Sequence, residues 1–249
     1  MSMPIFKYVP PSYLQPIENR PGNVISSSFK AILVIDFGGH DHVDIARHIL
    51  EASQNPPPMY LRFGSNITPP QSSTTIKLLP YTLYAVNMVD LGVNGEQLHI
   101  DNRLLYPDNI TIKGLIVDSG SSMSYLTQGA YDLVVRKLDQ HFSKYKGEFI
   151  KLDVGNKLCY SRTKGVKEYN NIPGVTYYFE GGSKLDVIPE ATFTRKASSG
   201  KSEMFCLTIH PTKVNLNVLG SFQQVNVKFI FNIKDETLQF GREDCAKNG

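Results

Sequence analysis

The pattern of hydrophobic and polar positions divides the chain at about residue 58. Residues 1–28 are rich in Pro, Ser and Asn, and they predict an irregular lead-in. The apolar run from Ala31 to Ile35 then predicts a buried strand that stops at the glycines of "FGG". Apolar residues at helical spacing in "VDIARHILEAS" predict a short helix, which the prolines of "QNPPP" end. One strand and one short helix are too small to bury a core by themselves.

Beyond residue 58, short apolar runs separated by turn residues predict a mostly β fold. The segments "MYLRFGS", "TTIKLLP" and "TLYAVNMVDLGV" are typical of strands, and Asn94-Gly95 predicts a two-residue turn that joins "VDLGV" to "EQLHI". The segment "VTYYFEGGSKLDVIP" predicts two strands around a Glu-Gly-Gly turn. Further strands are expected in "MFCLTIH", "VNLNVLG", "VKFIFNI" and "LQFG", the last two joined by the turn "KDET".

One convincing helix interrupts these strands. Thr127 can cap a helix from Gln128 to about Phe142. Its apolar stripe, which we interpret as core packing, is made of Ala130, Leu133, Val134, Leu138 and Phe142.

Composition and charge exclude several classes of partner. The 249 residues are 41% hydrophobic, and 26 basic and 23 acidic residues without long runs give a net charge of +3. We therefore expect a globular protein that does not bind nucleic acid. No stretch approaches the ~18 apolar residues of a membrane helix, so we expect no membrane partner.

The signals for cellular location conflict. The N-terminus "MSMPIFKYVPPSYLQP" lacks the apolar middle of a signal peptide, so no signal peptide is visible in this chain. Asn66 and Asn109 each begin an Asn-Ile-Thr triplet and are glycosylation candidates if the chain enters the secretory pathway.

The cysteine and histidine residues predict no metal site and no cofactor. Cys159, Cys206 and Cys245 have no C-x-x-C spacing, which argues against a zinc ribbon or a redox motif. The odd number leaves at least one thiol unpaired or bonded to another chain. His40 and His42 would share one face of an extended segment, but no second ligand cluster follows, so a polar loop is the simpler interpretation.

The strongest candidate for chemistry is Asp118 in "GLIVDSGSSMSYL". The buried run Leu115 to Val117 leads to the aspartate, Gly120 permits close backbone approach, and Ser119 and Ser121 offer hydroxyls that hold a carboxylate. Asp, Ser and Gly are also common turn residues, so these four letters alone favour a structural turn.

A second segment, "NVLGSFQQVNVKFIFNIKDETLQFGREDC", strengthens the functional interpretation. It resembles the closing strands of plant pepsin-like aspartic proteases of the nepenthesin type, which carry a similar L-G-x-F-Q-Q-x-N signature. The resemblance continues in order through residues 58–245, in "YLRFGS", "LYAVNMVDLGVNGEQLHI", "GLIVDSGSSMSYLTQGAYD", the "LCY" around Cys159 and the "FCLTIH" around Cys206.

The resemblance implies specific roles for residues of the predicted turn. Members of this family have two β lobes around a cleft, and each lobe contributes one aspartate in a D-[ST]-G-[ST] turn. Asp118 matches the catalytic aspartate of the second lobe, Ser119 the residue that bonds across the lobe interface, and Ser121 the hydroxyl that orients the carboxylate. Gly120 and Gly220 match structural glycines.

The resemblance also bears on the cysteines and on location. Cys159 and Cys206 match a pair that is disulfide-bonded in relatives. Cys245 matches a cysteine whose partner lies in the first lobe, and no cysteine precedes residue 159 here. The family uses no metal or cofactor, and it suggests a secreted or vacuolar protein.

The resulting prediction of fold is an incomplete bilobal architecture. We expect an irregular lead-in over residues 1–28, a remnant of the first lobe over residues 29–75, and a second, pepsin-like lobe over residues 76–247. This lobe is expected to be mostly β, with folded or closed β-sheets and one or two short helices.

The mechanism of this family needs two carboxyl groups, and only one is found. One carboxylate draws a proton from the attacking water while the other, protonated, polarises the scissile carbonyl; aspartic proteases are the standard case of two carboxyls that share one proton. Asp36 also follows an apolar strand, but Phe37 and Gly39 stand where the supporting hydroxyl residues would be. The segment around Asp36 is more similar to the late first-lobe segment, so we do not expect Asp36 to be the second catalytic residue.

We therefore predict a member of the aspartic endopeptidase family that acts on a peptide or protein and carries one catalytic residue, Asp118. Activity would need a second copy that pairs two Asp118 turns across a two-fold axis, or a separately encoded first lobe. The alternative is a catalytically inactive, protease-like binding or inhibitor protein. A third interpretation is a truncated gene product with no independent function, because removal of half of a two-lobed core exposes an apolar interface.

Overall fold

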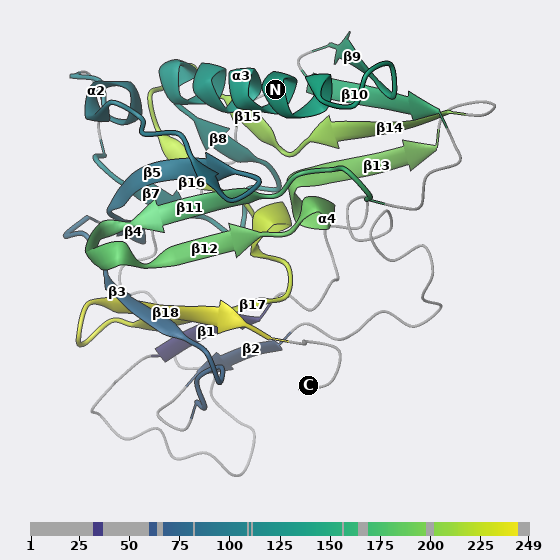
Figure 1. Cartoon of the computed structure of the whole chain (residues 1–249). Helices are drawn as coiled ribbons and strands as arrows, with labels where there is room; N and C mark the ends of the chain where they lie inside the picture. Colours follow the sequence, from purple (N-terminus) through teal and green to yellow (C-terminus); the bar gives the residue numbers. More distant parts are fainter. Residues whose placement is uncertain are drawn as a thin grey trace.

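The computed structural model describes residues 32–36, 60–63, 67–81, 83–108, 110, 112–155, 157–163, 169–197 and 202–243, the first two ranges by their backbone alone. The predicted lead-in, the helix expected in "VDIARHILEAS", the histidines at 40 and 42, both glycosylation candidates and Cys245 lie outside these residues. Strands predominate in the described residues, which confirms the predicted mostly β fold (Figure 1).

The elements in chain order agree with most of the predicted segments. The strands are β1 (Ile32–Asp36), β2 (Tyr60–Phe63), β3 (Thr74–Lys77), β4 (Ala85–Val86), β5 (Met88–Val93), β6 (Glu96–Gln97), β7 (Leu115–Val117), β8 (Ser124–Leu126), β9 (Phe149–Val154), β10 (Lys157–Thr163), β11 (Val175–Phe179), β12 (Lys184–Val187), β13 (Phe193–Ala197), β14 (Ser202–Leu207), β15 (Ile209–Pro211), β16 (Asn217–Leu219), β17 (Val227–Asn232) and β18 (Thr237–Arg242). The helices are α2 (Asn102–Leu105), α3 (Gln128–Ser143) and α4 (Pro189–Thr192), with 3-10 turns η2 (Glu180–Gly182) and η3 (Ser221–Gln224).

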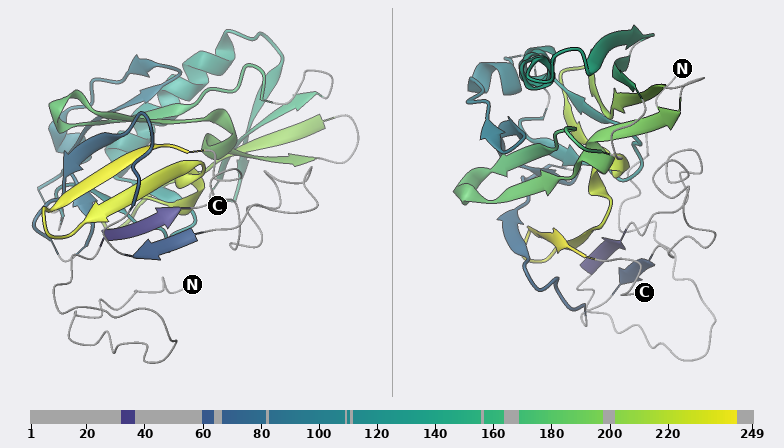
Figure 2. Two further views of the ribbon diagram at one scale, coloured as in Figure 1. Left: turned by 90° about the horizontal axis from the view of Figure 1, so that it is seen from below. Right: turned by 45° about the vertical axis from the view of Figure 1, so that its right-hand side comes forward.

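These strands form four sheets. Two have five strands, in the orders β2-β1-β17-β18-β3 and β15-β8-β16-β7-β4, and two have four strands, in the orders β13-β14-β10-β9 and β12-β11-β5-β6. Figures 1 and 2 show α3 on one side of the molecule and the β17–β18 hairpin on the opposite side.

The two ends of the described chain meet in one sheet. The predicted N-terminal strand forms as β1 and pairs antiparallel with β17, with Leu33 opposite Phe231. The predicted turn "KDET" joins β17 to β18, and β18 pairs with β3. Strands from residues 29–75 thus share a sheet with the C-terminal hairpin, and the division of the chain into lobes stays a prediction.

The turn signals in the sequence also locate two further hairpins correctly. Asn94 and Gly95 adopt positive φ angles of 53° and 79°, as a tight two-residue hairpin turn requires, and they join β5 to β6. Gly181 and Gly182, with φ angles of 80° and 84°, turn β11 into β12.

Helix α3 packs its predicted apolar stripe into the core. Ala130, Val134, Leu138 and Phe142 are buried, and Leu133 is partly buried. The predicted cap is right in position and wrong in mechanism, because the Thr127 hydroxyl donates to the carbonyl of Leu104 and makes no bond to a helix N–H. No helix in the described part of the chain is long and apolar enough to cross a membrane.

A buried ion cluster lies beside the disulfide and was not predicted. Cys159 and Cys206 stand opposite each other on β10 and β14 and are bonded, as the resemblance implied. Three residues further along both strands, the fully buried Arg162 donates from Nε to Oε1 of Glu203 at 3.0 Å. Arg195 donates from Nε to the other carboxylate oxygen at 2.7 Å. Two cations on one buried carboxylate keep Glu203 paired, as a buried charge requires.

Candidate active site

The β15-β8-β16-β7-β4 sheet fixes both ends of the candidate catalytic turn. β16 lies between β7 and β8, parallel to the first and antiparallel to the second. Val117, the last residue of β7, pairs with Leu219 at the end of β16. The next residue, Asp118, donates its backbone N–H to the carbonyl of Leu219 at 3.0 Å. The aspartate is therefore anchored to a strand that comes a hundred residues later in the chain.

The carboxylate of Asp118 accepts a hydrogen bond on each oxygen. The backbone N–H of Gly120 donates to Oδ1 at 2.9 Å, and the Ser121 hydroxyl donates to Oδ2 at 2.7 Å. Asp118 itself is half-buried. Because both oxygens are held, the carboxylate has one orientation and still reaches solvent, which is what a group that must contact a substrate needs.

Gly220 lets the backbone that follows β16 touch the turn. A Cβ atom at this position would lie 2.3 Å from the Met123 carbonyl oxygen and 2.8 Å from that of Ser121. Just beyond it, Ser221 donates its backbone N–H to the Ser121 carbonyl at 2.7 Å, and Phe222 donates to Ser122 at 3.1 Å. No side chain fits between the two segments, so the glycine predicted from the resemblance has a steric reason.

A buried amide, Gln223, supports the same turn through hydrogen bonds. This residue was not identified from the sequence. Its Oε1 accepts from the Ser124 hydroxyl at 2.8 Å and from the Tyr177 hydroxyl. Its Nε2 donates to the Thr208 hydroxyl at 3.3 Å. Ser124 in turn accepts the Gly220 N–H at 3.0 Å, so the amide and the glycine belong to one network.

Two more buried polar residues tie β16 to its surroundings. Gln224 donates from Nε2 to the Leu219 carbonyl at 2.8 Å. Asn217 accepts the Thr127 N–H at 3.1 Å and donates to the Leu105 carbonyl at 2.9 Å, which links β16 to α2 and to the start of α3. Polar residues inside an otherwise apolar segment, as in "NVLGSFQQ", were the available signal for this network.

The structure thus brings five of the predicted residues together and leaves others apart. Asp118, Ser119, Gly120, Ser121 and Gly220 form one site. In the described part of the chain, no interaction joins the Asp118 carboxylate to a second carboxylate, and the Ser119 hydroxyl has no hydrogen-bond partner. That is the hydroxyl that the resemblance assigns to a bond across the lobe interface, and this role stays a prediction.

Asp36 does not share the sheet of Asp118. Its backbone pairs with Lys228 in β17 and with Tyr60 in β2, both in the β2-β1-β17-β18-β3 sheet.

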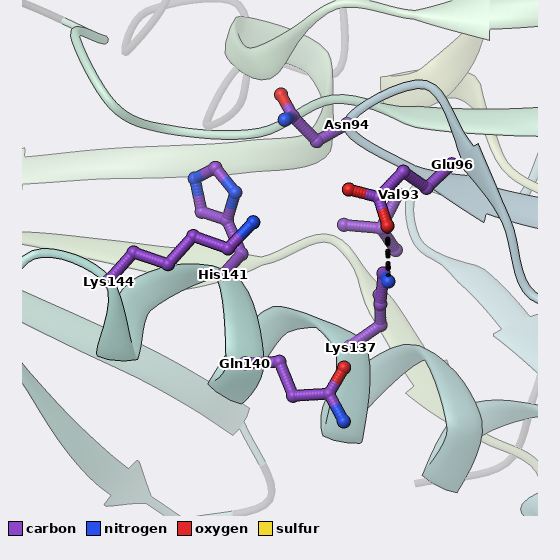
Figure 3. Close-up of a pocket in the computed structure, with 7 residues that line it drawn as sticks. All are labelled: Val93, Asn94, Glu96, Lys137, Gln140, His141 and Lys144. Carbon is purple, nitrogen blue, oxygen red and sulfur yellow. Dashed lines mark hydrogen bonds and ion pairs between the residues drawn. The ribbon is translucent and has the colours of Figure 1, made fainter.

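A separate hollow lies between the β5–β6 hairpin and α3 (Figure 3). Lys137 bonds to Glu96 at 2.5 Å across it, and the neighbouring Lys144 and His141 also face it. The hydrogen bond and charge of Lys137, followed by the charge of Lys144, lower the pKa of Glu96. None of the residues around Asp118 lines this hollow, so it is separate from the candidate active site.

The family comparison agrees with this geometry. A protein-family model described as "Xylanase inhibitor C-terminal" matches residues 83–242, which include the whole Asp118 turn, β16 and Gly220.

Similar proteins include plant aspartic proteases. Aspartic proteinase nepenthesin-1 of Nepenthes gracilis is 24% identical over 172 residues, which cover 66% of this chain and 36% of that protein. Aspartyl protease 25 of Oryza sativa subsp. japonica is 25% identical over 193 residues, which cover 74% of this chain and 42% of that protein. Aspartic proteinase nepenthesin-2 of Nepenthes gracilis is 20% identical over 198 residues, which cover 78% and 43%.

The chain spans about two-fifths of the length of these curated relatives. The family match extends over well over half of the chain itself, and it includes every residue of the candidate catalytic turn. The chain therefore belongs to the xylanase inhibitor C-terminal family, a family of pepsin-like aspartic protease lobes.

Proposed function

We propose that this chain is the second lobe of an aspartic endopeptidase and supplies Asp118 as one of two aspartates that activate a water molecule. The observation that carries the proposal is the fixed carboxylate of Asp118, with a donor on each oxygen and a half-buried position. A purely structural turn aspartate needs neither the second donor nor the distant contact with the strand that ends at Leu219.

The reaction requires a second carboxyl group from another polypeptide segment. One carboxylate takes a proton from water, the water oxygen bonds to the scissile carbonyl carbon, and the protonated carboxyl donates to the carbonyl oxygen. Collapse of this intermediate breaks the C–N bond, and the amine leaves with a proton. We propose that a partner first lobe supplies the other aspartate, with a second copy of this chain as the alternative source.

Cleavage of a denatured protein at acid pH tests the proposal. The chain is assayed alone, and then mixed with a separately produced first lobe of nepenthesin-1. We expect activity in a mixture that contains both aspartates, block by a statine-type transition-state mimic, and a loss of at least ~100-fold in Asp118→Asn. The control is Asp132→Asn, which changes an exposed carboxylate on α3 and should leave the rate unchanged. Cleavage that survives Asp118→Asn would contradict the proposal.

A second candidate function is a catalytically inactive inhibitor or binding protein. The name of the matching family favours it, because that name refers to the inhibition of a glycoside-cleaving enzyme. Hydrolysis of xylan by a xylanase, measured with increasing amounts of this chain, tests this candidate. Inhibition that is equal for the wild type and Asp118→Asn, without protein cleavage at any acid pH, would favour the inhibitor over the protease.

A further inference from the structure

Strand β9 presents an open edge of the β13-β14-β10-β9 sheet. Among the described strands it has a hydrogen-bonded neighbour on one side only, β10, and it lies at the periphery of the molecule in Figures 1 and 2. Two of its apolar side chains are unusually open for a strand, with Ile150 63% and Val154 46% exposed. An open edge with exposed apolar residues is a template for the addition of another strand.

The two faces of β9 differ. Phe149 packs against Phe142 of α3, with ring centroids 4.6 Å apart, and Lys151 bonds to Asp139 of the same helix at 2.7 Å. Side chains alternate along a strand, so Phe149, Lys151 and Asp153 share the face toward α3. The apolar residues Ile150, Leu152 and Val154 share the opposite face.

The direction of the free backbone groups follows from the disulfide pair. The Cα atoms of Cys159 and Cys206 are 4.0 Å apart, which is close to the ~4.5 Å of a non-hydrogen-bonded pair and unlike the ~5.5 Å of a hydrogen-bonded one. The backbone groups of Cys159 therefore point away from β14, toward its partner Leu152 in β9. Since the direction alternates, Lys151 and Asp153 direct their N–H and C=O groups to the open edge.

We infer that β9 pairs with β9 of a second copy of this chain, antiparallel about a two-fold axis at Leu152. In this register Lys151 lies opposite the partner's Asp153, and their outward backbone groups exchange hydrogen bonds. Ile150 lies opposite the partner's Val154, and the two Leu152 residues meet on the axis as a close, non-hydrogen-bonded pair. The sequence "IKLDV" is thus complementary to itself in charge, in apolar contact and in hydrogen-bond direction.

Charge favours a second copy of β9 over other strands as the partner at this edge. Charged residues usually protect an open edge, because an added strand would bury or repel them. Here each lysine meets an aspartate, so these charges do not protect the edge against an antiparallel copy of the same strand. A single strand pair is a small interface, so we expect a dimer that forms in the micromolar range. Since β9 and β7 belong to different sheets, this dimer is independent of the proposed catalytic role of Asp118.

Sedimentation velocity of the whole chain over the micromolar range tests the inference by charge reversal. Lys151→Glu places acids opposite acids, and Asp153→Lys places lysines opposite lysines. We expect either variant alone to weaken dimerisation at least tenfold. An equimolar mixture of the two variants restores opposite charges and should dimerise, as should the double variant Lys151→Glu/Asp153→Lys. Circular dichroism checks that each variant is folded.

Three outcomes of this series decide the inference. A wild type that stays monomeric throughout the range overturns the inference. A dimer that both single variants form as well as the wild type also overturns it, because the contact would then lie elsewhere. Recovery in the mixture supports it, since a general loss of folding or solubility would not be reversed by the second variant.

Discussion

Gln223 should contribute strongly to the stability of the fold through its buried hydrogen bonds. Methionine has nearly the same length and volume, so Gln223→Met removes the hydrogen bonds without opening a cavity. It leaves the hydroxyls of Ser124 and Tyr177 without their acceptor, and both residues are fully buried. A buried polar group without a partner costs ~1–3 kcal/mol, so the free energy of unfolding should fall by about 2–6 kcal/mol.

A second substitution tests the reason for this loss. Tyr177→Phe removes one of the two hydroxyls that Gln223→Met leaves without a partner. On its own it should cost ~1 kcal/mol, because it removes a single hydrogen bond and Gln223 keeps Ser124. Added to Gln223→Met, it should recover ~1 kcal/mol or more, because a buried unsatisfied hydroxyl disappears.

Urea unfolding of the four proteins, followed by far-ultraviolet circular dichroism, measures these differences. The dependence of the unfolding free energy on urea should be the same for all four, which shows that the compactness of the folded and unfolded states has not changed. A loss below ~1 kcal/mol in Gln223→Met would refute the argument. A Tyr177→Phe substitution that lowered the free energy of unfolding as much in the Gln223→Met background as it does in the wild type would also refute it.

Three further predictions concern other contacts. Gly220→Ala should lower the free energy of unfolding in urea by about 3 kcal/mol or more, since its Cβ would lie 2.3 Å from the backbone of the turn. The control is Gly129→Ala, whose Cβ would meet only a flexible side chain and which should lower it by less than ~1 kcal/mol. Equal losses in the two variants would contradict the steric reason. Loss of the disulfide in Cys159→Ser should cost about 4 kcal/mol for a loop of 47 residues, and an unchanged midpoint would argue against the bond. Hydrogen bonds from Arg103 lower the pKa of Asp101 to about 2, so its stabilising contribution should be full above pH ~4 and should be lost as the pH falls from there through about 2. Titration followed by NMR should show this midpoint in the wild type and a higher one in Arg103→Ala.

Local patterns were sufficient for the parts of the fold that local forces determine. The apolar stripe of α3, the Asn94-Gly95 turn and the strand before Asp118 are each visible within a dozen residues. Strands β9, β10 and β13 were not predicted as strands, because their alternation is interrupted by charged residues. The charges on β10 and β14 have a tertiary reason, the buried pair of Arg162 and Glu203.

The candidate site was predictable only in part, because several of its contacts join segments that are far apart in the sequence. The turn around Asp118 was found from its own letters together with the distant Gly220. The partners of Gln223 come from β8, from β11 and from the link between β14 and β15, so no spacing within the sequence reveals them. The ion cluster could have been found, since Arg162 and Glu203 stand three residues from the bonded cysteines on antiparallel strands.

The insertion of β16 between β7 and β8 has a consequence for synthesis of the protein. Ser124 and Gly220, which bond to each other beside the aspartate, are 96 residues apart in the chain. At ~5–20 residues per second, a ribosome needs on the order of 5–20 s to add the second after the first. During that time the emerging polypeptide already contains Asp118 but has no strand to hold it. The Asp118 carboxylate can therefore take the orientation of the folded turn only after β16 and Gly220 have been made, about 100 residues later than the aspartate itself.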